Sequence, residues 1–466
     1  MVVFSKFQTL GHSCHEYAHP WTPSCTEASA FIGFHAVFEC LRIYTTVYML
    51  ALLMRGKIPS VPHIKKTVLG ILQSSAFLTS HGFSFILVVC TIRKILGNFN
   101  YLTVSFLPAF ISSFISILVE RPSRRSLLCL YVANVASETL FRMAVSRGIV
   151  RSIPKGEVLI FMGSIAALLY SYRGTHSSRD PIYALLRFVV GPYEEKGFAE
   201  NREILPAVPK VSCSRNKAAE PFSAKGNTSP SNLGNQRQRS VLPCTLLMCK
   251  VYKSLVRKLK DGGRHPLCPH PSSCAYYCIQ GSANLFSVGY SLQVCLTFLL
   301  GIKKWIREPK SMPKIFLSMD SLKLGAFLGG FSGLFRLTSC CQRKLFNSDS
   351  PFMGITAGMV AGLTFWVYPN TTVALYMFWK MLEVMYNTGI EKGQLPRIPG
   401  STIFLYCFFT SILFHAAVLE PHNLRPSYWK FLVRLSGGRF QDINRDCLVA
   451  YGTSNAKLYK SLKPFL

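Results

Sequence analysis

Cysteine and histidine residues gather in two short stretches of the sequence, one at the N-terminus and one after residue 260. The members are Cys14, His15, His19 and Cys25 in the first group and His265, Cys268, His270, Cys274 and Cys278 in the second. Thiolate sulfur and imidazole nitrogen are donors that Zn²⁺ favours, but neither group contains a CxxC pair. Three interpretations stand side by side: bound zinc, disulfide bridges, and thiols without a ligand. A reducing cytosolic face would argue against the bridges.

Two carboxylates, Glu138 and Glu383, fall within helical segments that are otherwise largely apolar. A carboxylate at membrane depth is costly and is by default a functional candidate. Arg142 follows Glu138 by four residues, and Lys380 precedes Glu383 by three, which are spacings of helical ion pairs. The pattern therefore predicts either structural ion pairs or the polar groups of a translocation or proton pathway.

His81 lies in an apolar segment with hydroxyl side chains near it, among them Thr79 and Ser80 directly before it. Such a histidine can act as a general base, or it can be satisfied by a neighbouring helix. The sequence contains no GxSxG, HExxH, phosphate-binding loop or dinucleotide fingerprint. We therefore expect a protein that is not an enzyme.

The bulk composition indicates the class of protein that positions these residues. Of 466 residues, 49% are hydrophobic and only 16% are charged, and the mean hydropathy is +0.27. These values are typical of a multi-pass membrane protein. The net charge of +31 predicts contact with anionic lipid headgroups or acidic partners. The basic residues lie in short flanks between apolar runs, which disfavours nucleic acid. The composition indicates no particular oligomeric state.

Apolar runs near the length of a membrane span recur along the chain. They cover residues 30–54, 67–91, 101–119, 158–172, 284–302, 323–341, 352–368 and 401–419, and two further helical runs with internal charges cover 126–145 and 373–388. The sequence thus predicts an all-α, multi-pass integral membrane helical bundle.

The first and second halves of the chain contain similar sequence segments, which indicates an internal repeat. AFLTSHGFSFILVVCTIRK begins at residue 76 and AFLGGFSGLFRLTSCCQRK at 326, and Cys90 and Cys340 occupy the same place in them. RDPIYALLRFVVG at 179 and RPSYWKFLVRLSGG at 425 close the two repeats. We predict two homologous halves of about five helical segments each. If all five cross the bilayer, the halves are inverted, as in many transporters; if the fourth lies at the interface, they are parallel.

Composition also predicts the boundaries of six segments. They are a Cys/His-rich N-terminal segment (1–29), a first membrane repeat (30–191), a flexible polar linker (192–240), a basic amphipathic helix with the second Cys/His-rich segment (241–281), a second membrane repeat (282–440) and a C-terminal tail (441–466). The basic amphipathic helix is typical of a membrane-surface or partner-docking helix.

Glycines recur at four-residue spacing on two successive apolar segments of the second half. They are Gly325, Gly329 and Gly333 on one segment and Gly354, Gly358 and Gly362 on the next. Small residues at this spacing let helix backbones approach closely in lipid. The pattern predicts a tight pair of these two helices, or alternatively a cavity or sliding surface beside them.

Two family resemblances follow from these motifs. The glycine-faced second half resembles the four-helix unit of the mitochondrial inner-membrane translocase superfamily. The whole chain outside the linker resembles the transmembrane protein 135 family, also called a peroxisomal membrane protein family. The phrases that carry this second resemblance are CHEYAHPWTPSC at 14, LQSSAFLTSHG at 72, CTIRKILGNF at 90, SETLFRM at 137, ALLRFVVG at 184, SVGYSLQVCL at 287, LGAFLGGF at 324 and LRPSYWKFL at 424.

The second resemblance implies a multi-pass protein of peroxisomal and mitochondrial membranes. It implies a non-enzymatic regulator or scaffold in mitochondrial fission balance, lipid handling and energy metabolism, with organelle-division or lipid-metabolism proteins as partners. It implies no catalytic residues and no established cofactor. A transporter or lipid-conducting protein is the alternative that the repeat and the two carboxylates favour.

Overall fold

The computed structural model describes residues 8–54, 60–174, 180–195, 254–301, 307–308 and 318–451. Within these ranges the secondary structure is helical, apart from one isolated bridge between Leu10 and Phe99. Five of the described helices are long and apolar enough to cross a membrane: Val61–Leu96, Pro122–Ser146, Cys274–Leu299, Met319–Phe346 and Ser401–Leu419. The prediction of an all-α helical membrane protein is confirmed.

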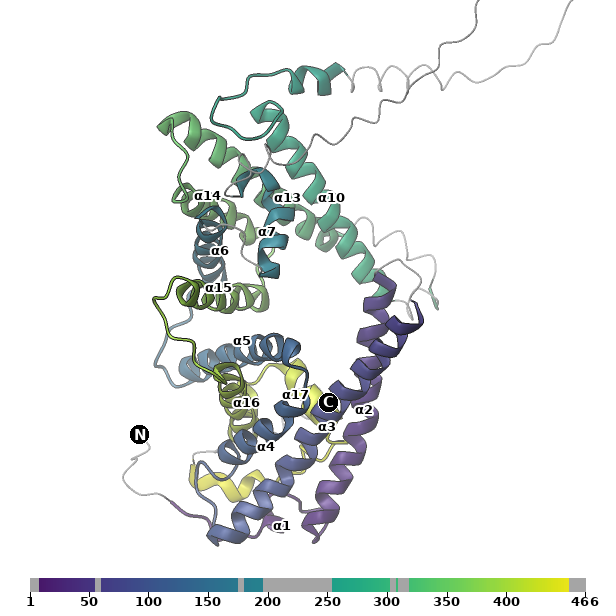
Figure 1. The fold of residues 1–466 in the computed structure, drawn as a ribbon. Helices are drawn as coiled ribbons and strands as arrows, with labels where there is room; N and C mark the ends of the chain where they lie inside the picture. The colour runs from purple at the N-terminus through teal and green to yellow at the C-terminus, as the bar shows by residue number, and fades with distance from the viewer. Residues whose placement is uncertain are drawn as a thin grey trace, which may run out of the picture. The chain divides into compact units, whose positions relative to one another are not determined.

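The helices of the two halves follow one another in the same order (Figure 1). The first half contains α1 (Cys14–Tyr17), α2 (Cys25–Met54), α3 (Val61–Leu96), α4 (Phe106–Val119), α5 (Pro122–Ser146), α6 (Gly156–Gly174) and α7 (Pro181–Val190). The second contains α10 (Cys274–Leu300), α13 (Met319–Phe346), α14 (Met353–Gly362), α15 (Thr371–Glu391), α16 (Ser401–Leu419) and α17 (Pro426–Leu435). The runs at 101–119 and 352–368 form apolar segments shorter than a span, Phe106–Val119 and Met353–Val367.

Local signals explain where several of these helices begin and end. Proline occupies the first turn of α3, α5, α7 and α17, where its missing N–H costs nothing. The Asp180 side chain caps α7 and the Asn370 side chain caps α15 by accepting a backbone N–H. Gly97 ends α3 in the left-handed region, at φ 71°, which favours glycine.

The chain forms two compact units, and each unit contains helices from both halves. Unit 1 comprises Met1–Phe161 and Asn370–Leu466, and unit 2 comprises Met162–Pro369. Thus α1–α5 pack with α15–α17, whereas α7 and most of α6 pack with α10, α13 and α14. The last two helices of the first half thus lie mostly in unit 2, and the last three helices of the second half lie in unit 1.

In unit 1, α16 lies among helices of the first half. It runs antiparallel to α4, because Phe106 contacts His415 and Phe110 contacts Phe404. It runs parallel to α5, because residues near both starts line one cavity and Arg147 pairs with Glu420 near both ends. α16 is the most buried of the five candidate spans, with 67% of its apolar window inside the structure.

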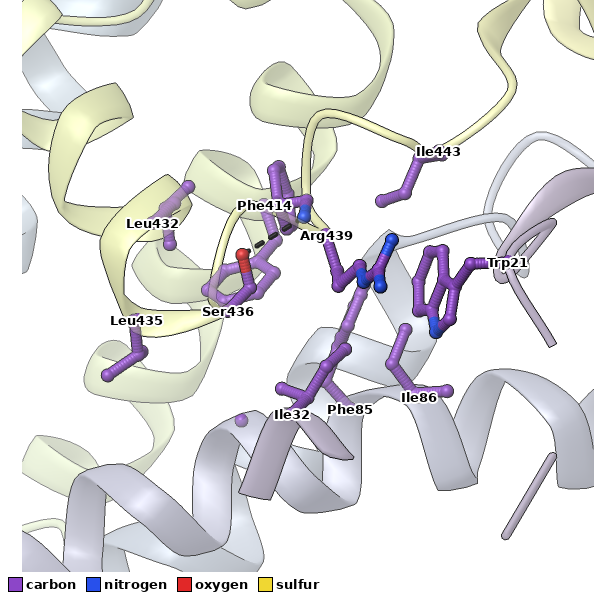
Figure 2. Close-up of a pocket in the computed structure, with 12 residues that line it drawn as sticks. Trp21, Ile32, Phe85, Ile86, Phe414, Leu432, Leu435, Ser436, Arg439 and Ile443 are labelled. Carbon is purple, nitrogen blue, oxygen red and sulfur yellow. Dashed lines mark hydrogen bonds between the residues drawn. The ribbon is translucent and has the colours of Figure 1, made fainter. Parts of the chain in front are cut away.

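The segment after α17 packs against the start of α2 in unit 1. Arg439 lies over the rings of Trp21 (5.4 Å) and Phe31 (4.9 Å), which is cation–π geometry. Figure 2 shows Arg439 beside Trp21, with Phe414 of α16 close by. The cavity that these side chains surround has a volume of about 30 Å³, which is room for a single water molecule. We therefore regard this region as core packing.

Two helices at equivalent places in the predicted repeat, α5 and α15, pack against one another in unit 1. Ser126 near the start of α5 bonds Glu383 in the second half of α15, whereas Asn134, further along α5, donates to the carbonyl of Thr372 at the start of α15 (2.7 Å). The contacts run in opposite chain directions. The equivalent helices of the two halves are therefore antiparallel.

The two glycine faces of unit 2 do not pack on one another. A Cβ at Gly329 would lie 2.8 Å from the carbonyl oxygen of Ser282 on α10, and one at Gly325 would lie 3.0 Å from that of Phe286. The Gly354, Gly358 and Gly362 face instead meets α6 at Leu169, Ala166 and Met162. The two helices α13 and α14 are neighbours, as predicted, but their glycine faces meet α10 and α6, because the spacing specifies a close approach and leaves the partner open.

The predicted segments between the repeats are described only in part. The linker at 192–240 lies outside the described residues after residue 195, and so does the start of the basic amphipathic helix. Residues 254–260 of that helix are helical, as predicted. In the C-terminal tail, Arg445–Tyr451 form a 3₁₀ helix whose Tyr451 hydroxyl donates to the carbonyl of Gln8 (2.8 Å).

Candidate metal centres

Three cysteines and one histidine meet at the open end of the α2–α3 hairpin, in a group here named centre 1. Its members are Cys14, His19, Cys25 and Cys90. One donor atom from each lies within 4.8 Å of the other three. This is the donor set of a Cys₃His zinc site.

The local sequence fixes each donor of centre 1. Ser13 and Glu16 form a capping box around α1, which places Cys14 at the first position of that helix. Cys25 is the first residue of α2, and Cys90 lies in the last two turns of α3. Because α2 and α3 are antiparallel neighbours, the start of one meets the end of the other.

The geometry of centre 1 suits a metal better than a disulfide. The Sγ atoms of Cys14 and Cys25 are 3.4 Å apart, against about 2.05 Å for a disulfide and about 3.8 Å for two sulfurs on a tetrahedral zinc with Zn–S bonds of about 2.3 Å. His19 is fully buried, and its Nδ1 lies 2.8 Å from the carbonyl oxygen of Thr22. Its Nε2 is buried and has no hydrogen-bond partner among the described residues.

That arrangement of His19 matches a metal-ligating histidine. Such a ring donates one N–H to a carbonyl, which leaves the lone pair of the other nitrogen for the metal. A buried nitrogen without a partner otherwise costs about 1–3 kcal/mol. The orphaned Nε2 of His19 therefore fits a bound cation.

Centre 2 repeats this donor set in unit 2 with Cys268, His270, Cys274 and Cys340. The Sγ atoms of Cys268 and Cys274 are 3.8 Å apart, and Cys340 Sγ lies 3.4 Å from His270 Nε2. Nδ1 of His270 lies 2.7 Å from the carbonyl oxygen of Ser272, as its counterpart does in centre 1. Cys274 begins α10, and Cys340 lies near the end of α13, so the centre again closes a hairpin.

Buried charged side chains lie next to centre 2. Arg343, one turn after Cys340, binds both carboxylate oxygens of Glu194 at 3.0 and 2.7 Å, and both side chains are almost fully buried. Arg173 lies 3.9 Å from the same carboxylate. Burial opposes ionisation of Glu194, yet the Arg343 guanidinium holds its pKa below the usual range. The ring of Tyr277 stacks on His270 with centroids 4.4 Å apart.

The thiols and imidazoles respond to this burial. Burial raises the pKa of Cys268 to about 11 and also raises the pKa of Cys14. It lowers the pKa of His270, which favours the neutral imidazole that binds metals. Without a metal, Cys268 is therefore protonated at neutral pH, and zinc would displace that proton on binding.

The structure selects among the predicted ligands and adds two. Cys14, His19, Cys25, Cys268, His270 and Cys274 come together as predicted. His15 is exposed, and His265 and Cys278 belong to neither group. Sequence reasoning missed Cys90 and Cys340, yet both stood at the same place in the repeat, which was the available signal.

The carboxylates of Glu138 and Glu383 lie in ion pairs. Glu138 contacts Arg142 at 2.6 Å and also binds Arg425 on the segment before α17. Glu383 contacts Lys380 at 2.7 Å and Ser126 of α5. Both pairs that the helical spacing predicts are present. A translocation role for these carboxylates stays a prediction.

His81 is buried on α3 between α4 and α16. Its Nδ1 lies 3.4 Å from the Ser112 hydroxyl, and its ring meets Phe414 edge-on at 4.8 Å. Neighbouring helices thus contact the His81 side chain, as the alternative to a general-base role requires. Catalysis by His81 stays untested.

These features define a helical membrane protein with a duplicated Cys₃His centre. Residues 11–145 match the sequence family described as the N-terminal cysteine-rich region of Transmembrane protein 135. This region includes all four residues of centre 1, and over it the chain is similar to the transmembrane protein 135 family. The match does not reach the second half, so the similarity of that half to the mitochondrial translocase superfamily stays a prediction. No solved structure matches the chain.

Proposed function

We propose that this protein is a zinc-binding integral membrane protein that holds one Zn²⁺ in each of its two centres. The observation that carries the proposal is the recurrence of one donor set at equivalent places: one cysteine begins the first helix of a hairpin, one lies near the end of the second helix, and a cysteine and a histidine precede both. Chance thiol clusters have no reason to repeat in this way.

The zinc in each centre has a structural role. Four protein ligands close the coordination sphere, whereas catalytic zinc keeps a position for water or substrate. The ion would join the loop before a hairpin to both of its helices at the open end. The chemistry that it supplies is cross-linking of chain segments, which stabilises the folded state.

The test is the metal content of the full-length chain purified in detergent without chelators. Elemental analysis should find about two zinc ions per chain. Titration of thiols in denaturant, before and after reduction, separates zinc from the disulfide interpretation. A folded chain without zinc, whose cluster cysteines are not reactive until they are reduced, would refute the proposal.

In the cell, we propose a non-enzymatic regulator or scaffold of peroxisomal and mitochondrial membranes that acts on fission balance and on lipid and energy metabolism. The family match supports this proposal. Deletion of the protein should change mitochondrial length. Re-expression should restore that length and recruit organelle-division proteins to the chain. If re-expression restores neither mitochondrial length nor recruitment, this role is wrong.

A second candidate is a transporter with inverted halves, which the antiparallel packing of α5 and α15 favours. The loops that follow these helices would then face opposite sides of the membrane. A protease site inserted after Arg151 and one inserted after Gln394 should show opposite protection in sealed vesicles. Equal protection, or no substrate-stimulated flux after reconstitution, would remove this candidate.

A further inference from the structure

We infer that unit 1 contains a binding site for a neutral single-chain lipid, in the cavity between α5, α15 and α16. This inference goes beyond metal binding, because no residue of either metal centre lines the cavity. The cavity has a volume of about 690 Å³. That size lies within the range of small-molecule sites, roughly 300–1,000 Å³.

The wall of the cavity is mostly hydrocarbon. Leu130 and Ala133 line it from α5, Leu382 from α15, and Leu405 and Phe409 from α16. A hydrocarbon chain gains dispersion contacts in such a space, and water there finds few hydrogen-bond partners. The wall therefore suits the chain of a lipid.

The loop between α15 and α16 forms part of the cavity wall. The Tyr386 hydroxyl donates to the carbonyl of Pro396 and accepts from the N–H of Ile398, both at 3.2 Å. Leu395 packs on Gly389, where a Cβ would lie only 2.7 Å from its side chain. The loop is thus fixed to α15, which keeps Ile398, Pro399 and Gly400 in the wall.

The polar side chains of the wall bear on the headgroup, and they include Ser401 and Thr402 at the start of α16. Glu383, Ser126 and the exposed amide of Asn387 line the cavity, and none of its lining residues is Lys, Arg or His. The Glu383 carboxylate already contacts the Lys380 ammonium at 2.7 Å. The Glu383 carboxylate would repel an anionic headgroup, and no lining residue supplies a cation to bind it. A cationic headgroup would compete with the Lys380 ammonium for the same carboxylate. A hydroxyl headgroup can donate to Glu383 and accept from Asn387.

The test is photolabelling of the full chain in detergent with three probes that carry the same photoreactive chain: a monoacylglycerol, a fatty acid and a long-chain amine. The monoacylglycerol should label peptides of α5, α15 and α16 most strongly, and unlabelled monoacylglycerol should compete. Leu382→Trp fills the cavity and should abolish this labelling. Met385→Trp, one turn along α15 and outside the lining, is the matched control and should leave it unchanged.

A second variant tests the headgroup. Glu383→Gln removes the negative charge, so the fatty acid should gain labelling relative to the monoacylglycerol. Zinc content and the thermal unfolding midpoint report whether each variant is folded, independently of lipid. Equal labelling by all three probes in a folded protein, unchanged by Leu382→Trp, would show non-specific partitioning of the probes into detergent or onto apolar surfaces and would overturn the inference.

Discussion

Centre 1 and centre 2 share a donor set and differ in what surrounds it. In centre 2, Arg343 neutralises the buried Glu194 carboxylate, and Tyr277 covers the histidine ring. In centre 1 the residue equivalent to Arg343 is Arg93, which donates to the backbone carbonyls of Gly11 and His12 at 2.9 and 2.8 Å. The same arginine position thus supports a loop in one half and a buried ion pair in the other.

The hairpins that carry the centres differ too. In α10–α13, Gly325 and Gly329 bring two helix backbones into contact. In α2–α3, a Cβ at Gly82 would find Ala36 and Ile32 at an ordinary 3.7 Å. The metal donors are therefore equivalent in the two hairpins, whereas the helix packing and the charged residues beside the donors differ. This difference indicates that the donors are the constrained part of the repeat.

Removal of one cysteine from each centre is the strongest test of that equivalence. Cys90→Ser and Cys340→Ser should each reduce the zinc content from about two ions to about one, because each breaks one four-ligand site. The unfolding midpoint should fall sharply, since structural zinc contributes of order 10 kcal/mol in small domains. Cys341→Ser, beside Cys340 and exposed, is the control and should retain both ions. Loss of both ions from either variant would end the picture of two independent centres.

The buried charge of centre 2 should matter more than any surface charge near it. Glu194→Gln leaves Arg343 without its buried carboxylate partner and should destabilise the fold by about 3–5 kcal/mol. Glu195→Gln removes an ion pair to Arg187 that is 3.4 Å long and partly exposed, and should cost less than about 1 kcal/mol. Chemical denaturation in detergent compares the two. Equal effects would mean that burial of the pair is unimportant.

Acid should affect this network in a predictable direction. The pKa of Glu194 is lower in the folded protein than in the unfolded chain, so its ionisation stabilises the fold at neutral pH. That contribution is lost as the pH falls through the folded-state pKa, below the unfolded value of about 4.3. Unfolding midpoints measured from pH 7 downward should therefore fall for the wild type and more weakly for Glu194→Gln. Parallel curves would assign the acid response to other groups.

The hairpin comparison predicts a smaller effect. Gly329→Ala places a Cβ 2.8 Å from a backbone oxygen of α10 and should cost about 1–3 kcal/mol by overpacking. Gly82→Ala in the other hairpin should be neutral or slightly stabilising, because alanine favours helix by about 1 kcal/mol. Thermal midpoints measure both. A tolerated Gly329→Ala would show that the α10–α13 contact can relax.

The smallest effect is expected at His15. Its side chain is exposed and lies outside the ligand group, with its ring 6.2 Å from that of His19. His15→Ala should retain about two zinc ions per chain. Loss of one ion would show that His15 and not His19 is the nitrogen ligand of centre 1.

The sequence predicts helices well here because apolar runs and proline or polar caps mark them directly. It also predicts six of the eight metal donors, which lie close together along the chain. Cys90 and Cys340 were not predicted as donors because they lie about 65 residues after Cys25 and Cys274 in the sequence. They approach the other donors only in the folded antiparallel hairpin. The partners of the glycine faces escaped for a related reason: spacing describes one helix surface, and its partner is set by the tertiary fold.

The exchange of helices between the two units has a consequence for biosynthesis. Unit 1 needs α15–α17, which come from the last quarter of the chain, whereas its α1–α5 leave the ribosome first. Until α16 arrives, the faces of α4 and α5 that it covers lack their native neighbour. Domains that fold as they are synthesised do not wait in this way. Assembly of this protein is therefore expected to be post-translational and slow, with unit 2 able to fold before unit 1 is complete.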